Sequence, residues 1–144
     1  MLAFVLLMPA SASATCVFNS ISGAAFTYDA IGGANAMAAG AVSGTCDASS
    51  ATDVVISLDA GLHSGGSASP WREMLDSTND LLEYNLYLDP AHTAIWGDGT
   101  NGTATQSFAQ TAGSWSYTVY GVVPSGQKVR AGSYYDTVTV TMTY

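Results

Sequence analysis

Positive charge is almost absent from this sequence. Only three of its 144 residues are lysine or arginine, against 11 aspartates and glutamates, and the formal net charge is −8. A surface that binds nucleic acid or anionic lipid needs clustered cations that neutralise phosphate charge. We therefore expect neither nucleic acid nor an anionic membrane surface as a partner.

The sequence also shows no apolar run long enough to cross a bilayer as a helix. The run at residues 2–8 is far shorter than the roughly 20 residues that such a helix needs. It is followed by Pro9 and by Ala12-Ser13-Ala14, the small-residue pattern at which signal peptides are cleaved, although no positively charged region precedes it. We expect residues 1–14 to be a signal peptide, truncated at its start and cleaved between Ala14 and Thr15. Residues 15–144 are then one exported domain.

Cysteine is scarce as well, with only Cys16 and Cys46. Neither belongs to a Cys-x-x-Cys motif, so we expect no zinc or redox centre. In an exported chain an even pair indicates one disulfide, and two buried free thiols are the alternative. A bridge between them would close a loop of about 30 residues and stabilise the fold by roughly 3–4 kcal/mol in the chain-entropy model.

The many glycines and the alternating apolar residues predict short strands and tight turns rather than helices. The most regular alternation is at the C-terminus, where four apolar side chains face one way and four threonines face the other. The apolar four are Val138, Val140, Met142 and Tyr144. We predict strands at residues 17–28, 41–46, 53–58, 83–88, 93–96, 103–109, 115–123 and 133–144. Residues 30–40 are predicted to be a loop, and residues 70–82 to form one or two helical turns.

Such a series of short strands with frequent turns predicts an antiparallel β-sandwich. The last predicted strand reaches the final residue of the sequence, so we expect no later segment to cover a neighbouring edge. A regular strand at an open edge pairs readily with another chain.

The motifs that could carry chemistry are weak. Residues 97–102 match the glycine string of dinucleotide sites, but a β-type sequence follows them instead of a helix, so we interpret them as a turn. Asp98 and Asn101 in this turn do not have the spacing of a calcium loop. His63 and His92 stand alone in loop sequences. The only glutamates are Glu73 and Glu83. A glycosidase-type pair would need one of them together with an aspartate, and nothing in the sequence indicates such a pair. We therefore expect no catalytic residue, no metal and no cofactor.

Three tryptophans could stack on sugars: Trp71, Trp96 and Trp115. Core packing is the expected role for all three. Trp71 follows the Gly/Ser-rich residues 65–70, so it is the alternative candidate for an adhesive loop.

Several short blocks occur in a characteristic order along the chain. They include Tyr84-Asn85-Leu86-Tyr87, Trp96-Gly97-Asp98-Gly99-Thr100 and Gly132-Ser133-Tyr134-Tyr135-Asp136-Thr137-Val138. Together these blocks, with Asp59-Ala60-Gly61, Arg72-Glu73-Met74, Tyr120-Gly121 and Gly126-Gln127, resemble the spore coat protein U domain. That family includes the pilins of archaic, Csu-type chaperone–usher pili, and the resemblance covers residues 16–144.

The resemblance implies an incomplete immunoglobulin-like antiparallel β-sandwich that lacks its last strand. A periplasmic pilus chaperone, and then the next pilin subunit at the outer-membrane usher, would supply the donor strand. The strand with Val138, Val140, Met142 and Tyr144 would border the resulting groove. The two cysteines match the disulfide of the family. The implied location is the cell surface, reached through the periplasm.

Pilins of the shaft carry an alternating donor segment before the first cysteine. Cleavage after Ala14 leaves only Thr15 there, so the chain is expected to accept a strand without donating one, as a tip or minor subunit in adhesion or biofilm formation. The alternatives are a fragment of a longer tip protein, a secreted spore-coat or surface-coat component, and a carbohydrate-binding module.

Overall fold

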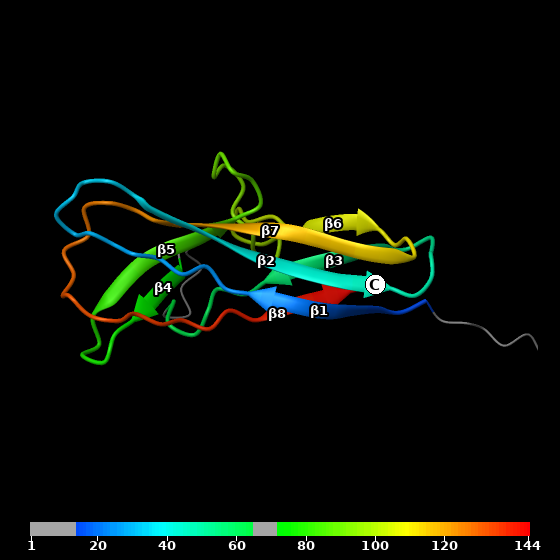
Figure 1. Ribbon diagram of the computed structural model, residues 1–144, viewed down its shortest axis with the longest axis horizontal. Helices are drawn as coiled ribbons and strands as arrows, with labels where there is room; N and C mark the ends of the chain where they lie inside the picture. The colour runs from blue at the N-terminus through cyan, green and yellow to red at the C-terminus, as the bar shows by residue number, and fades with distance from the viewer. Residues whose placement is uncertain (1–13, 65–71) are drawn as a thin grey trace, which may run out of the picture.

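The computed structural model describes residues 14–64 and 72–144, which form eight strands in two antiparallel sheets and contain no helix (Figure 1). The strands are β1 (Cys16–Ser22), β2 (Ala36–Cys46), β3 (Asp53–Leu58), β4 (Arg72–Leu75), β5 (Leu81–Tyr87), β6 (Gln106–Ala109), β7 (Gly113–Val123) and β8 (Val140–Thr143). The larger sheet has the order β1-β2-β7-β5-β4 and the smaller one the order β6-β3-β8. The predicted all-β antiparallel sandwich is confirmed.

The two longest strands, β2 and β7, form the centre of the larger sheet and pair along their whole length. Val42 on β2 and Val119 on β7 point into the space between the sheets, where each is less than 10% exposed. Val54 and Ile56 of β3 come from the opposite sheet and are completely buried. Alternation along each strand thus supplies one apolar face to a common core.

The structure confirms that Trp96 packs in the core. Its side chain is completely buried, and its indole Nε1 donates a hydrogen bond of 3.0 Å to the carbonyl of Ile56. The residues around it, predicted to be a short strand at 93–96, form only isolated bridges. Among the described residues there is no helix of the length and apolar character needed to cross a membrane.

The predicted loop at residues 30–40 is wrong in its second half, because β2 already begins at Ala36. Residues 36–40 pair in register with Val119–Val123 of β7, so backbone pairing overrides their weak strand preference. One position of this segment also requires glycine. A Cβ atom at Gly40 would collide with the carbonyl oxygen of Ser22, so only glycine permits the close approach of β1 here.

The predicted helical turns at residues 70–82 are also wrong. Residues 72–75 form β4, and a tight turn leads directly into β5. The carboxylate of Asp76 accepts hydrogen bonds from the backbone N–H groups of Thr78 (2.8 Å) and Asp80 (2.7 Å), and Asn79 has a φ of 65°. These side-chain bonds satisfy the backbone locally and replace the helical ladder.

The two predicted strands at the ends of the chain are shorter than expected. Residues 17–28 pair with β2 only as far as Ser22, and residues 133–144 pair with β3 only over Val140–Thr143. In each case the remaining residues continue without a neighbouring strand in the described part of the chain, apart from one bridge between Tyr135 and Leu75. These two incompletely paired segments border the same space.

Candidate functional site: an open groove between the two sheets

An apolar groove with a volume of about 1090 Å³ lies between the segment that follows β1 and the segment that precedes β8. In Figure 1 these segments run in opposite chain directions, from blue leftward and from orange to red rightward. The groove floor consists of buried apolar side chains from both sheets. They are Val42, Leu58, Met74, Leu82, Tyr84, Leu86 and Val119. Because these residues already form the core, the groove is an opening into the core itself.

We call residues 24–28 the first wall of the groove. Their side chains alternate, with Ala24, Phe26 and Tyr28 half-buried and the residues between them exposed. All three half-buried side chains line the groove. Among the described residues, the backbone of this wall forms no hydrogen bond. The first wall is therefore extended chain with free backbone donors and acceptors.

We call residues 134–139 the second wall. Tyr134, Asp136 and Val138 are half-buried and line the groove, while the residues between them are exposed. The backbone of residues 136–138 forms no hydrogen bond to any described part of the chain. Both walls thus present one row of unpaired backbone groups beside an apolar floor. Edges of this kind normally pair with another strand.

The four residues expected to border the groove do not all reach it. Val138 and Val140 line it, whereas Met142 and Tyr144 lie outside its lining. Met142 packs against the core instead, and Tyr144 is 48% exposed. The first wall and Ile21, which faces the groove and is 51% exposed, were not predicted to belong to this site. The signal for the first wall in the sequence is the alternation of Ala24, Phe26 and Tyr28, which continues the predicted strand at residues 17–28.

A buried polar cluster lies beside the second wall. Arg72 is 2% exposed, and its guanidinium donates three hydrogen bonds: Nε to the carbonyl of Asp59 (2.9 Å), Nη1 to Oδ1 of Asn85 (2.9 Å) and Nη2 to the carbonyl of Trp96 (2.6 Å). Burial lowers the pKa of Arg72, and the nearby Tyr84, Asp59 and Asp136 oppose that change. The arginine thereby joins the end of β3 to β4, β5 and the residues around Trp96.

Asp136 of the second wall is the centre of a second set of bonds in the same cluster. Its side chain is 2% exposed. It accepts hydrogen bonds from the backbone N–H of Leu62 (2.9 Å) and the hydroxyl of Tyr84 (2.6 Å), and His63 Nδ1 lies 3.0 Å from Oδ1. Burial raises the pKa of the Tyr84 hydroxyl, and the bond to Asp136 raises it further, so this tyrosine remains a donor at neutral pH. His63, which stands alone in a loop sequence, is thus brought against Asp136 by the fold.

The other described residues considered for chemistry lie outside the groove lining. Glu73 and Glu83 are opposite each other on β4 and β5, and His92 packs against the ring of Tyr87 at 5.3 Å between centroids. Within the described ranges, no three His, Cys, Asp or Glu side chains gather as metal ligands. Trp71 and the rest of the Gly/Ser-rich loop lie outside the described residues. The groove is thus suited to binding an extended apolar chain.

The glycine string at residues 97–102 is a turn, as expected. The carboxylate of Asp98 accepts bonds from the backbone N–H and the hydroxyl of Thr100, at 2.9 and 2.6 Å. Asn101 and two glycines have positive φ values. Trp115 has the expected packing role, with its ring 5.8 Å from that of Phe18 and 5.4 Å from that of Phe108.

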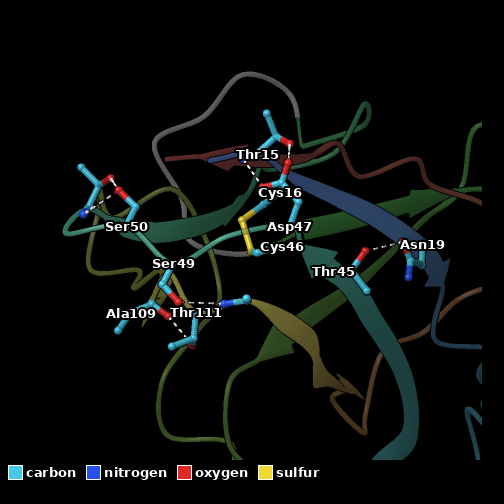
Figure 2. Close-up of a disulfide and its surroundings, with 12 residues drawn as sticks. Thr15, Cys16, Asn19, Thr45, Cys46, Asp47, Ser49, Ser50, Ala109 and Thr111 are labelled. Atoms are coloured by element: carbon cyan, nitrogen blue, oxygen red, sulfur yellow. Dashed lines mark hydrogen bonds between the residues drawn. A yellow bond between two sulfur atoms is a disulfide. The ribbon is translucent and has the colours of Figure 1, made fainter. Parts of the chain in front are cut away.

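The disulfide joins Cys16 and Cys46, which are directly opposite each other on β1 and β2 (Figure 2). Next to it, the carboxylate of Asp47 accepts bonds from both the backbone N–H and the hydroxyl of Thr15, at 2.7 and 2.6 Å. The bonds from Thr15 lower the pKa of Asp47. The start of β1 is therefore fixed to the end of β2 by one covalent bond and by these two hydrogen bonds.

Comparisons with known proteins agree with this architecture. Residues 2–141 match the family model described as the Spore Coat Protein U domain. Protein U of Myxococcus xanthus is 39% identical over 94 residues, which are 62% of this chain and 51% of that protein. The chain thus spans about half the length of this curated relative.

Two solved structures share the fold. One is the crystal structure of the CsuC–CsuE chaperone–tip adhesion subunit pre-assembly complex from the archaic chaperone–usher Csu pili of Acinetobacter baumannii. It matches with a TM-score of 0.63 and 21% identity, over 92% of this chain and 40% of the other. The second is a chaperone–tip adhesin complex of CFA/I fimbriae, with a TM-score of 0.54 and 11% identity, over 90% of this chain and 41% of the other.

Proposed function

The chain belongs to the Spore Coat Protein U domain family, and on that premise we propose that it is a structural subunit of a secreted surface fibre, assembled by donor-strand complementation. The observation that carries this proposal is a groove with unpaired backbone on both sides, at residues 24–28 and 136–138 of the described chain. A strand inserted between them would find backbone partners on both sides and an apolar floor for every second side chain. The proposed role is structural and not enzymatic.

The physical argument is that the groove leaves part of the core exposed to water. Ile21 faces the groove floor and is still half-exposed, although it lies directly opposite the buried Val42 on β2. Burying apolar surface is worth about 25 cal/mol per Å². A donor strand with alternating apolar residues would therefore complete the core and satisfy the backbone of both walls.

The proposed partners are a periplasmic pilus chaperone, an outer-membrane usher and other pilin subunits. A chaperone is supported by the two similar structures, both of which are complexes of a chaperone with a tip subunit. The same similarity supports a tip or minor position, with adhesion as its task. Trp71 and its loop are the proposed adhesive contact.

Export through the periplasm is proposed to include cleavage between Ala14 and Thr15. The new α-ammonium group of Thr15 would then lie where its backbone nitrogen is now, 2.7 Å from Oδ1 of Asp47. The mass of the exported protein is expected to correspond to residues 15–144. A mass that retains the first 14 residues would contradict the cleavage site.

The proposal is tested by adding a donor strand in trans. The probe is a synthetic peptide of alternating valine and threonine with lysines at both ends, which suit the net charge of −8. We expect the thermal midpoint of the exported protein to rise by 10 °C or more at saturating peptide, because binding to the folded state alone stabilises it. A peptide in which threonine replaces every valine is the control and should cause no shift.

A spore-coat or surface-coat component is the second candidate function, favoured by the match to the Spore Coat Protein U domain and by the 39% identity to Protein U. A complete domain of that kind would have a high midpoint without peptide and no shift with it. That outcome would favour the coat function over the fibre.

A further inference from the structure

The second wall of the groove keeps its place almost without strand pairing. Between the bridge at Tyr135 and the start of β8 at Val140, the partner of its backbone among the described residues is Asp59 of the loop that follows β3. Yet the apolar groove beside it favours collapse, since moving this wall toward the first one would remove apolar surface from water. Contacts other than the backbone hydrogen bonds of a strand pair must therefore keep the second wall apart from the first.

The structure supplies that support through two carboxylates. Oδ1 of Asp59 accepts a hydrogen bond from the backbone N–H of Thr139 (2.9 Å), and the backbone N–H of Asp59 donates to the carbonyl of Thr139 (3.1 Å). Burial alone would raise the pKa of Asp59, but the bonds from Thr139 and Gly61 and the charge of Arg72 hold that pKa below its usual value. Asp59 is therefore ionised at neutral pH and acts as a strong acceptor.

Asp136 attaches the same wall three residues earlier. Its carboxylate is bound by Leu62, His63 and Tyr84, so it connects the wall both to the loop after β3 and to β5. The fit is close, because a Cβ atom at residue 61 would collide with Oδ2 of Asp136, and Gly61 has a φ of 82°. Arg72 holds the base of this loop by donating to the carbonyl of Asp59.

We propose that Asp136 is the positioning residue of the groove: its buried carboxylate holds the second wall in the open, strand-accepting position before a partner arrives. This inference rests on the proposed function and adds to it the side chain that prepares the site. Side-chain acceptors suit the task because they leave the backbone of residues 136–138 free for the incoming strand. A ladder of backbone bonds would occupy the same groups.

The test compares binding of the alternating valine–threonine peptide to the exported protein and to two variants, at a temperature at which all are folded. Asp136→Asn keeps the size of the side chain and removes its charge. We expect its Kd for the peptide to rise about tenfold, because the apparent affinity falls with the fraction of molecules whose wall is in place. The matched control is Asp98→Asn, since the side-chain bonds of Asp98 within the described residues all go to Thr100 and Thr103 of its own turn, and its Kd should be unchanged.

Tyr84→Phe is the second variant and keeps the charge. It removes one donor to Asp136 while retaining the ring in the core, and we expect a rise in Kd of about threefold. If Asp136→Asn does not fold, the Kd of Tyr84→Phe alone tests the positioning role of Asp136. A normal Kd in either folded variant, even with a lower thermal midpoint, would show that the cluster only stabilises the fold and would overturn the proposal. Absence of peptide binding by the unchanged protein would overturn the proposed function itself, and this inference with it.

Discussion

Val140→Asp is expected to abolish capture of a donor strand while leaving the subunit folded. Val140 begins β8 and lines the groove. In the free subunit the groove is open, so water can solvate an aspartate there. An inserted strand would exclude that water and bury an unpaired charge, at a cost of several kcal/mol. We therefore expect peptide affinity to fall by about 100-fold or more, which corresponds to about 2.7 kcal/mol.

The neighbouring Thr141 provides the matched control. It lies on the same strand but is exposed on the opposite face, so Thr141→Asp introduces the same charge outside the groove. Titration of both variants with the valine–threonine peptide should show normal affinity for Thr141→Asp alone. Equal affinities in the two variants would show that the groove side of β8 does not receive the strand.

Cys46→Ser is expected to lower the free energy of unfolding by roughly 3–4 kcal/mol, as chain entropy predicts for a closed loop of about 30 residues. The bridge joins β1 to β2 at the end of the larger sheet, and β1 leads directly into the first wall. Loss of the disulfide therefore loosens β1, the strand that continues into the first wall of the groove. Urea unfolding under oxidising conditions measures the change, and the yield of exported protein should fall with it.

The double variant Cys16→Ser with Cys46→Ser separates the bridge from the thiol that the single variant leaves behind. Both should unfold at the same urea concentration, because neither has the bond. If either variant retained the stability of the oxidised protein, the disulfide would contribute nothing to holding β1 in place.

The sequence predicted the structure best where a strand has one buried face and one exposed face, because apolar and polar residues then alternate. The alternation of residues 53–58 predicts β3 without error, and the disulfide could be inferred from two cysteines in an exported chain. The helical turns at residues 70–82 were mispredicted because proline, methionine and leucine suggest a helix locally. What decides the structure there is the bonding of Asp76 and the burial of Arg72 against residues from other strands. Propensity contains no information about those distant partners.

The groove could be predicted only in part, for a related reason. A strand pattern shows which side chains face inward but does not show whether the backbone has a neighbour. Residues 24–28 and 136–138 keep the alternation of strands, but their backbone has no hydrogen-bond partner in the described part of the chain. In the sequence, Asp136 stands out only as part of a motif, because its role depends on Tyr84 and on the loop after β3, which are far away along the chain.

Hydrogen exchange of the two walls, with and without the valine–threonine peptide, tests the central claim most directly. The amides of residues 24–28 and 136–138 have no partner in the described part of the free chain, so they should exchange rapidly. At saturating peptide, amides in both walls should become protected, because an inserted strand pairs with both edges. Rapid exchange that persists in both walls at saturating peptide would contradict the account. So would strong protection of both walls before any peptide is added.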